Sequence, residues 1–386
     1  MSQIKTILYF ILVSLIMHSC IIPFEPQIDS KDINKYVISG QVSDNSDIQT
    51  VLVSKASAIG EPRYLPVSGC SVIINDDKYH SFIMTQSGEG KYTGRIDPKY
   101  LFAGASFKVK IVTPEGTMLE SDFDTMVECP VIDKLYYNII EVSGVDLTVI
   151  NQHMQFYVDI NAQNYKSRYF KWDVIETYEY HSEYPREWFY DGSVHHIIPP
   201  DSSRMVCWLT EADKNIYTLS TENLVENKYI KFPLHYVSNH TPNLVYGYSI
   251  LINQYALSEA AYSYWDNMRI NSADMGGLYE KQPLSITGNL HNLTDPDQEV
   301  LGFFTAALCS SQRLFFMNIE GMKIDFPGFC FPWAPTRGGF LEINPGEYPA
   351  FLMGDTATYY MVVLPDECVD CMTLGGTNIK PDFWPY

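Results

Sequence analysis

Basic residues are scarce in this sequence. Its 386 residues include 26 Lys or Arg against 46 Asp or Glu, which gives a formal net charge of −20. Nucleic-acid phosphates and anionic lipid headgroups are bound by clusters of Lys and Arg. We therefore expect no nucleic-acid partner and no attachment to a membrane through a polybasic surface.

Sequence motifs of catalysis are also missing. There is no nucleophile elbow, no HExxH helix for zinc and no recognisable pair of catalytic carboxylates. Gly88-Glu89-Gly90 lacks the lysine and the following helix that a phosphate-binding loop requires. These absences predict a protein that is not an enzyme and that carries no cofactor and no metal.

Long apolar runs are missing after the first 20 residues, so no later segment is expected to cross a membrane as a helix. The one early run, Thr6–Met17, follows Lys5 and is succeeded by the small residue Ser19, which is the pattern of an export signal. A run of about a dozen residues is too short to span a bilayer, which takes about 20.

The cysteine that follows Ser19 predicts a lipoprotein signal. In that chemistry the thiol of Cys20 receives a diacylglycerol, residues 1–19 are removed and the new amino terminus is acylated, commonly with palmitate, so that the acyl chains hold the protein to a membrane. Met17 and His18 depart from the usual Leu and small residue. A conventional or uncleaved signal with an incidental cysteine is therefore the alternative.

The residues after Cys20 predict where the anchor lies. Ile21 stands where a signal for retention in the inner membrane often has Asp, so we expect an outer-membrane location. Residues 20–34 contain two prolines and several charges without periodicity, and we interpret them as a tether. Their acidic residues resemble the acidic stretch of some surface-exported lipoproteins, which favours a body that faces the outside.

The other seven cysteines can form disulfides, because an exported protein folds in an oxidising compartment. An odd number leaves at least one thiol unpaired in a monomer. Cys368-Val369-Asp370-Cys371 has no second CxxC to complete a zinc site, and Pro365 and Gly375-Gly376 predict a loop around it rather than the helix start of a redox site. We expect disulfides that tie the tail to the body, and the candidates are Cys207, Cys330, Cys368 and Cys371.

Aromatic residues are abundant, with 28 Tyr, 20 Phe and 6 Trp, while runs of helix formers are few, which favours strands. Short alternating runs such as Tyr36–Ser43 are separated by turn residues, a pattern typical of β-sandwiches. The predicted fold class is mainly β: two tandem immunoglobulin-like or transthyretin-like β-sandwich domains and a β-rich C-terminal region with one short helix, Ser258–Ile270, capped by Ser258. The predicted boundaries are residues 35–128 for the N-terminal sandwich, 129–255 for the second and 256–386 for the C-terminal region.

Polar and aromatic side chains are densest between residues 178 and 196. The polar residues are His181, Glu183, His195 and His196, and the three histidines raise the hypothesis of a metal-dependent hydrolase, since histidine and glutamate ligate zinc. Their spacing matches no zinc motif, and Asp191-Gly192 predicts the tip of a hairpin with facing aromatic pairs, so we expect no metal. A binding surface for sugars or peptides is the other interpretation, because exposed aromatic rings mark interaction sites. Its candidate residues are Tyr178, Tyr180, Tyr184, Trp188 and Tyr190.

Stretches along the whole mature chain carry a family resemblance. They are Cys20, Tyr36–Ser43, Pro66–Val72, Gly90–Tyr92, Val131–Asp133, Cys207-Trp208, Tyr262–Trp265, Gln282–Asn289, Leu301–Phe304, Cys368–Cys371, Gly375–Thr377 and Lys380–Trp384. In these stretches the chain resembles a family of Bacteroidota outer-membrane lipoproteins of unknown function, typically encoded next to TonB-dependent receptors. The resemblance implies an outer-membrane TonB-dependent transporter as partner and lends no catalytic residues. Cys70 and Cys309 stand where it leads us to expect Ala and a small residue, so we expect both thiols to be free, and Cys70 to be buried.

We therefore expect a non-enzymatic outer-membrane lipoprotein that binds a small-molecule or peptide ligand for a TonB-dependent transporter, or that is an accessory subunit of such a transporter. The alternative is a structural or adhesive surface protein in which the β-sandwiches act as spacers.

Overall fold

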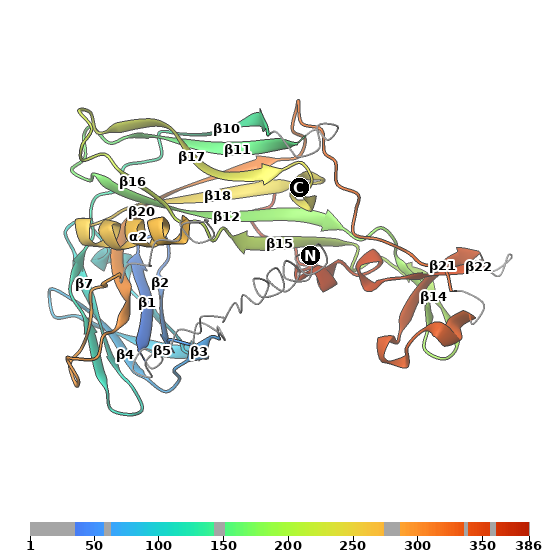
Figure 1. The fold of residues 1–386 in the computed structure, drawn as a ribbon, viewed down its shortest axis with the longest axis horizontal. Helices are drawn as coiled ribbons and strands as arrows, with labels where there is room; N and C mark the ends of the chain where they lie inside the picture. The colour runs from blue at the N-terminus through green and yellow to red at the C-terminus, as the bar shows by residue number, and fades with distance from the viewer. Residues whose placement is uncertain are drawn as a thin grey trace, which may run out of the picture.

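The computed structural model describes residues 35–57, 63–142, 151–273, 286–335, 339–355 and 360–385. The predicted signal, Cys20 and most of the tether lie outside these residues. Strands make up 49% of the structure and helices 11%, which confirms the mainly β prediction. Figure 1 shows three parts: a first sandwich at the lower left, a middle sandwich above it and a small distal sheet at the right. Within the described residues no helix is long and apolar enough to cross a membrane.

The first sandwich follows from alternation of apolar residues in short strands. In β1 the side chains of Tyr36, Ile38 and Val42 are buried, and β4 and β7 alternate in the same way. Its strands are β1 (Tyr36–Ser43), β2 (Ile48–Lys55), β3 (Leu65–Pro66), β4 (Ser71–Asp76), β5 (Ser81–Gly88), β6 (Lys91–Arg95), β7 (Ser106–Val112), β8 (Met118–Ser121), β9 (Asp124–Thr125) and β19 (Leu290–Asn292). They enclose one core, to which Leu290 and Phe304 contribute from late in the chain.

The middle sandwich consists of two layers around an aromatic core. One layer is β10 (Lys134–Glu141), β11 (Gln152–Asn161) and β17 (Lys228–Ser238); the other contains β12 (Tyr169–His181), β15 (Val206–Ala212), β16 (Tyr217–Ser220) and β18 (Tyr248–Ala256). Trp172 of β12 is fully buried and stacks on Phe232 of β17 with 4.7 Å between ring centroids. Ring pairs of this kind join the two layers. Figure 1 shows these layers one above the other.

A single long strand, β20 (Leu301–Phe316), connects the two sandwiches. Its first half pairs in parallel with β1, from Val37 opposite Leu301, and its second half pairs antiparallel with β18, as far as Tyr248 opposite Phe316. The result is one 15-stranded sheet that runs through both sandwiches. At Gly302, where φ is +105°, a β-carbon would lie 1.8 Å from the carbonyl oxygen of Ile38, so only glycine lets the two strands approach so closely.

The α-helix of the described residues, α2 (Glu259–Ala273), begins where the sequence predicts it. The hydroxyl of Ser258 accepts a hydrogen bond from the backbone N–H of Ala261 at 3.1 Å, as an N-cap does. The helix lies at the junction of the two sandwiches (Figure 1) and packs on Phe303 and Ala307 of β20. Short 3₁₀ turns are η1 (Pro98–Tyr100), η2 (Pro242–Leu244), η3 (Gly339–Glu342), η4 (Pro345–Glu347), η5 (Asp366–Cys368) and η6 (Cys371–Leu374).

The distal sheet has the order β14-β13-β21-β22. Its strands are β13 (Arg186–Tyr190), β14 (Val194–Asp201), β21 (Ala350–Asp355) and β22 (Tyr360–Leu364). Ile343, Leu352 and Val363 form a small core of its own. Residues 256–386, predicted as one C-terminal region, are thus distributed over all three parts of the molecule.

Two disulfides secure the tail, as predicted from the cysteines: Cys207–Cys371 and Cys330–Cys368. Cys70, Cys129 and Cys309 are free. The prediction of a buried Cys70 is wrong in degree, because the residue packs at the margin of the first core and stays partly accessible. Burial nevertheless raises the pKa of its thiol above the ordinary value.

Candidate functional site

The five aromatic residues proposed as a binding surface do not share one surface. Tyr178 and Tyr180 are 8% and 2% exposed, because alternate residues of β12 point to the same side and this side is the core of the middle sandwich. Tyr184 packs beside Cys368, and Trp188 and Tyr190 pack on the core of the distal sheet. As a single exposed platform, the proposed surface is therefore wrong.

The histidines behave as the hairpin interpretation predicts. β13 and β14 form a hairpin around Asp191-Gly192, in which His195 faces Phe189 and His196 faces Trp188. Each of these histidines also contacts a carboxylate of the same hairpin, Asp191 or Glu187. His181 lies instead at the end of β12. Among the described residues no group of three His, Cys, Asp or Glu side chains is arranged to hold a metal ion.

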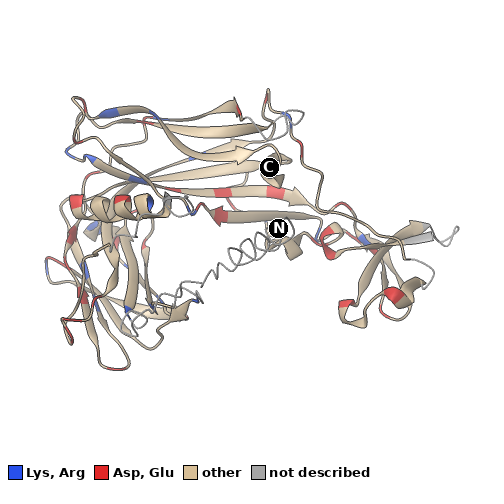
Figure 2. Cartoon of the chain, in the orientation of Figure 1, with Lys and Arg blue, Asp and Glu red and all other residues tan. Residues whose placement is uncertain are grey.

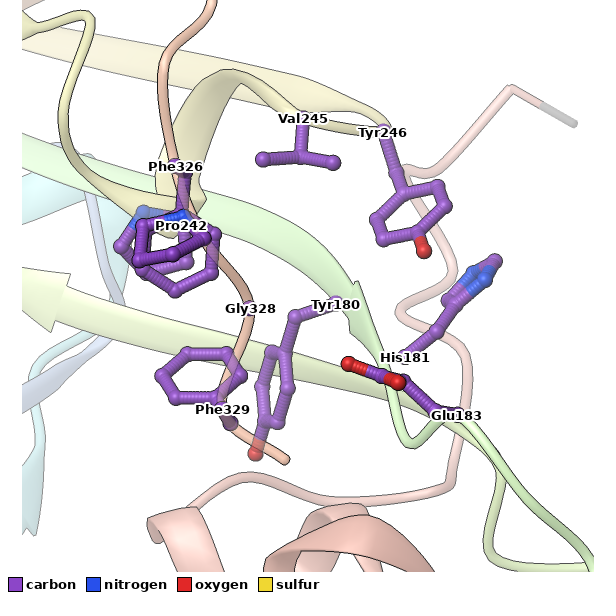
Figure 3. Close-up of a pocket in the computed structure, with 10 residues that line it drawn as sticks. Tyr180, His181, Glu183, Pro242, Val245, Tyr246, Phe326, Gly328 and Phe329 are labelled. Atoms are coloured by element: carbon purple, nitrogen blue, oxygen red, sulfur yellow. The ribbon is translucent and has the colours of Figure 1, made fainter. Parts of the chain in front are cut away.

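A cavity of about 270 Å³ lies where β12 ends, and we call it the aromatic pocket. Three segments far apart in sequence form its walls: the end of β12 with the residues after it, the turn that contains η2, and a loop before Cys330. The lining residues are Tyr180, His181, Glu183, Pro242, Val245, Tyr246, Phe326, Pro327, Gly328 and Phe329. Figure 3 shows the rings of Tyr180, Tyr246 and Phe329 around this space.

Hydrogen bonds and ring stacking hold the walls of the aromatic pocket in place. The hydroxyl of Tyr180 donates a hydrogen bond to the carbonyl of Cys371 at 2.6 Å and accepts one from the N–H of Gly376 at 3.1 Å, so the tail fixes this ring. The ring of His181 stacks on Tyr246, with centroids 3.7 Å apart, and its Nε2 contacts Glu179 at 2.8 Å. These contacts set both ring orientations before any ligand arrives.

The loop Phe326–Phe329 is fixed at both ends. Before it, the N–H of Asp325 donates to the carbonyl of Asn239 at 2.9 Å; after it, Cys330 forms its disulfide with Cys368. Within it, Phe326 and Phe329 meet edge to face at 5.0 Å, and Phe329 also contacts Tyr180. The phenylalanine wall is therefore preorganised.

Glu183 supplies the charge of the aromatic pocket. No Lys or Arg is among the lining residues, and Glu183 forms no ion pair or hydrogen bond with the described part of the chain. Its carboxylate points into the space between the rings of Tyr180 and Tyr246 (Figure 3). A β-carbon at Gly328, where φ is +91°, would lie 2.8 Å from Oε1 of Glu183, so the glycine leaves room for the carboxylate.

A larger groove, of about 750 Å³, lies between the first and middle sandwiches. Gln41 and Asn45 line it on one side, and Lys171 and Asp173 on the other. Lys171 bonds to Asp173, and its ammonium lies 4.6 Å from the ring centroid of Trp265. Lys171, Asp173 and Trp265 already interact with one another. Fewer groups in the groove are therefore available to bind a ligand than its volume suggests.

A buried ion cluster joins the two layers of the middle sandwich. The imidazole of His235 on β17 lies 2.9 Å from Asp213 and 3.3 Å from Glu176 on β12. Burial acts to lower the pKa of His235, but the bonds to both carboxylates outweigh it and raise the pKa to about 9. Burial likewise opposes ionisation of Asp213, yet His235 and Tyr217 together hold its pKa well below the usual range. The cluster is thus an imidazolium between two carboxylates.

The sequence-based reasoning missed most of this site. It singled out Tyr180, His181 and Glu183 but not Tyr246, the loop Phe326–Phe329 or His235. Phe326-Pro327-Gly328-Phe329 does carry a local signal, a Pro-Gly turn between two aromatic residues. Nothing in the local sequence of the other two segments, the end of β12 and the turn that contains η2, indicates that they contact this loop.

The family is established by comparison with known proteins. A model described as a domain of unknown function, DUF4249, matches residues 21–313. The chain belongs to the DUF4249 family. The match includes Tyr180, His181, Glu183 and Tyr246, while the phenylalanine loop and three of the four disulfide cysteines lie beyond it. No curated protein matches the chain. The predicted membership in an uncharacterised family is confirmed.

Proposed function

We propose that this DUF4249 protein is a non-enzymatic outer-membrane lipoprotein, anchored through Cys20 and facing the outside. Its body binds a small-molecule or peptide ligand as an accessory subunit of a TonB-dependent transporter. The observation that carries the proposal is the aromatic pocket, whose walls are fixed by hydrogen bonds and a disulfide before a ligand arrives. Preformed concave sites with a few polar groups are the usual form of ligand sites.

The position of the pocket supports this role. β1, the first strand after the predicted tether, belongs to the first sandwich, at one end of the molecule (Figure 1). The tip of β12, where the aromatic pocket lies, points toward the distal sheet. A ligand bound there is held away from the anchored end. The disulfides Cys207–Cys371 and Cys330–Cys368 also fit an exported protein.

Charge supports the same role. Figure 2 shows Lys and Arg scattered singly over this view rather than gathered on one face. The net charge of −20 disfavours attachment of the body to anionic lipid. Attachment then depends on the acyl chains at Cys20.

One observation favours the alternative of a structural or adhesive spacer. β20 pairs with β1 and with β18, which makes the two sandwiches one continuous sheet and a stiff body. Thermal unfolding with candidate nutrients separates the two functions. A ligand-binding subunit gains stability from its ligand, whereas a spacer shows no shift with any of them.

We expect Cys20→Ser to release the full chain from the outer membrane. Without the thiol no diacylglycerol can be attached, and the remaining protein has no other membrane anchor in this proposal. Fractionation followed by intact-mass measurement checks this result: the unchanged protein sediments with outer membranes and carries the mass of its acyl chains. Cys70→Ser is the matched control and stays membrane-bound. Retention of the Cys20→Ser protein in the outer membrane contradicts the anchor.

Co-purification tests the transporter. The unchanged lipoprotein, extracted in mild detergent, is expected to bring down a TonB-dependent transporter in a stable ratio. If it never does so, while its acyl anchor is intact, the accessory role is wrong and the spacer function gains support.

A further inference from the structure

We propose that the aromatic pocket binds a cationic organic group, an ammonium or guanidinium the size of an amino-acid side chain. This inference rests on the proposed ligand-binding function and specifies the ligand class for it. Beside His181 and several apolar residues, the pocket is lined by aromatic rings and one carboxylate, and both of these attract positive charge.

The rings provide the first reason. Tyr246, Phe326 and Phe329 line one cavity, and the buried ring of Tyr180 forms part of its wall (Figure 3). The face of an aromatic ring carries negative potential, so several faces around one cavity favour a cation over a neutral group of the same shape. Cys371 and Gly376 fix the ring of Tyr180, His181 stacks on Tyr246, and the disulfide fixes the phenylalanine loop, so a cation enters without reordering the rings.

The charge of the pocket provides the second reason. Glu183 is exposed and unpaired within the described residues, and its carboxylate points between two of the rings. A neutral ligand without hydrogen-bond donors would remove water from this carboxylate without replacing the lost hydrogen bonds, and an anion would be repelled. A cation replaces the water with a charge-assisted contact. Gly328 leaves room for the carboxylate in this position, because a β-carbon there would lie 2.8 Å from Oε1.

The size of the pocket limits the ligand. A cavity of about 270 Å³ lies at the small end of ligand sites and suits one side chain or one small molecule. The cation can thus come from a lysine or arginine side chain of a peptide, or from a free quaternary ammonium compound. Both sources present the same chemistry to the rings and to Glu183.

Paired probes test the inference on the full chain, purified in detergent, by calorimetric titration. Choline is compared with neohexyl alcohol, which has carbon in place of the charged nitrogen, and Nα-acetyl-lysine methylamide with its norleucine analogue. We expect at least one cationic probe to bind roughly tenfold more tightly than its neutral partner. The probe that binds best identifies the source. Equal binding within both pairs, or no binding by any probe, overturns the inference.

Variants assign the binding to this pocket. Glu183→Gln and Tyr246→Ala are each expected to lower the affinity for the cationic probe roughly tenfold, because each removes one contact with its positive charge. Tyr246 is 39% exposed, so its loss leaves the fold intact, which thermal unfolding checks. Glu89→Gln, in an exposed turn of the first sandwich, is the matched control and leaves binding unchanged. Unaltered affinity in both pocket variants overturns the assignment. Membrane retention and co-purification with a transporter are measured separately, so either proposal can fail alone.

Discussion

Replacing Cys207 and Cys371 together with serine is expected to lower the free energy of unfolding by about 5 kcal/mol. The two cysteines are 164 residues apart, so the bond removes a very large loop from the unfolded ensemble. It also holds the tail under β15, where Thr377 pairs with Trp208 and Trp384 packs on that ring. Urea unfolding of the variant and of the unchanged protein measures the difference.

The second disulfide and a free cysteine provide the comparison. The bond between Cys330 and Cys368 closes a shorter loop, with a sequence separation of 38 residues. For this loop the same chain-entropy relation gives a stabilisation of about 4 kcal/mol. Cys70→Ser removes a partly exposed free thiol and is expected to change stability far less. A Cys207→Ser/Cys371→Ser protein as stable as the Cys70→Ser protein would show that the tail contributes nothing to the fold.

The strands and the helix could be predicted because their signals are local. In β1 the buried residues Tyr36, Ile38 and Val42 stand at alternate or nearly alternate positions, which is visible in the sequence. Ser258 before a helical run marks the start of α2, and its hydroxyl does accept the cap hydrogen bond. Such patterns depend on neighbours in the chain, not on tertiary partners.

The arrangement of β20 could not be predicted in this way. The sequence pattern of these residues indicates two shorter strands. Nothing local shows that Leu301–Ala307 will pair with β1, or that the residues after Ala307 will pair with β18. Gly302 is the one hint, since glycine within an apolar strand marks close approach of another backbone. Its partner, Ile38, is set only by the tertiary fold.

The candidate site was found only in part, for a related reason. The alternation in β12 places Tyr178 and Tyr180 on one side, but it does not say whether that side faces the core or the solvent. The aromatic pocket needs three segments to meet, and the phenylalanine loop reaches the end of β12 through the Cys330–Cys368 bond. The four cysteines could be identified as candidates, whereas their pairing depends on the fold.

The stability of the middle sandwich is expected to fall as the pH rises from about 6.5 to about 9, because His235 loses its proton in that range. The folded-state pKa lies above the unfolded value, so the stabilisation is complete below pH 6.5 and disappears above pH 9. The difference between 6.5 and about 9 corresponds to roughly 3 kcal/mol. The lowered pKa of Asp213 has the same cause, its contact with His235, so it is not counted again in this free energy. Urea unfolding at several pH values measures the loss, and NMR titration of the imidazole gives the midpoint.

Two histidine variants show whether the effect belongs to the cluster. His235→Gln is expected to be less stable and to lose the dependence between pH 7 and 9, because Glu176 and Asp213 then lie near each other with no cation between them. His291→Gln removes an exposed histidine of the first sandwich that pairs with the exposed Asp122, and it should keep the dependence. A His235 midpoint at or below 6.5 contradicts the paired imidazolium. In that case the cluster does not help to hold the two layers together, since a neutral imidazole could not neutralise two carboxylates that the fold places within 3.3 Å of it.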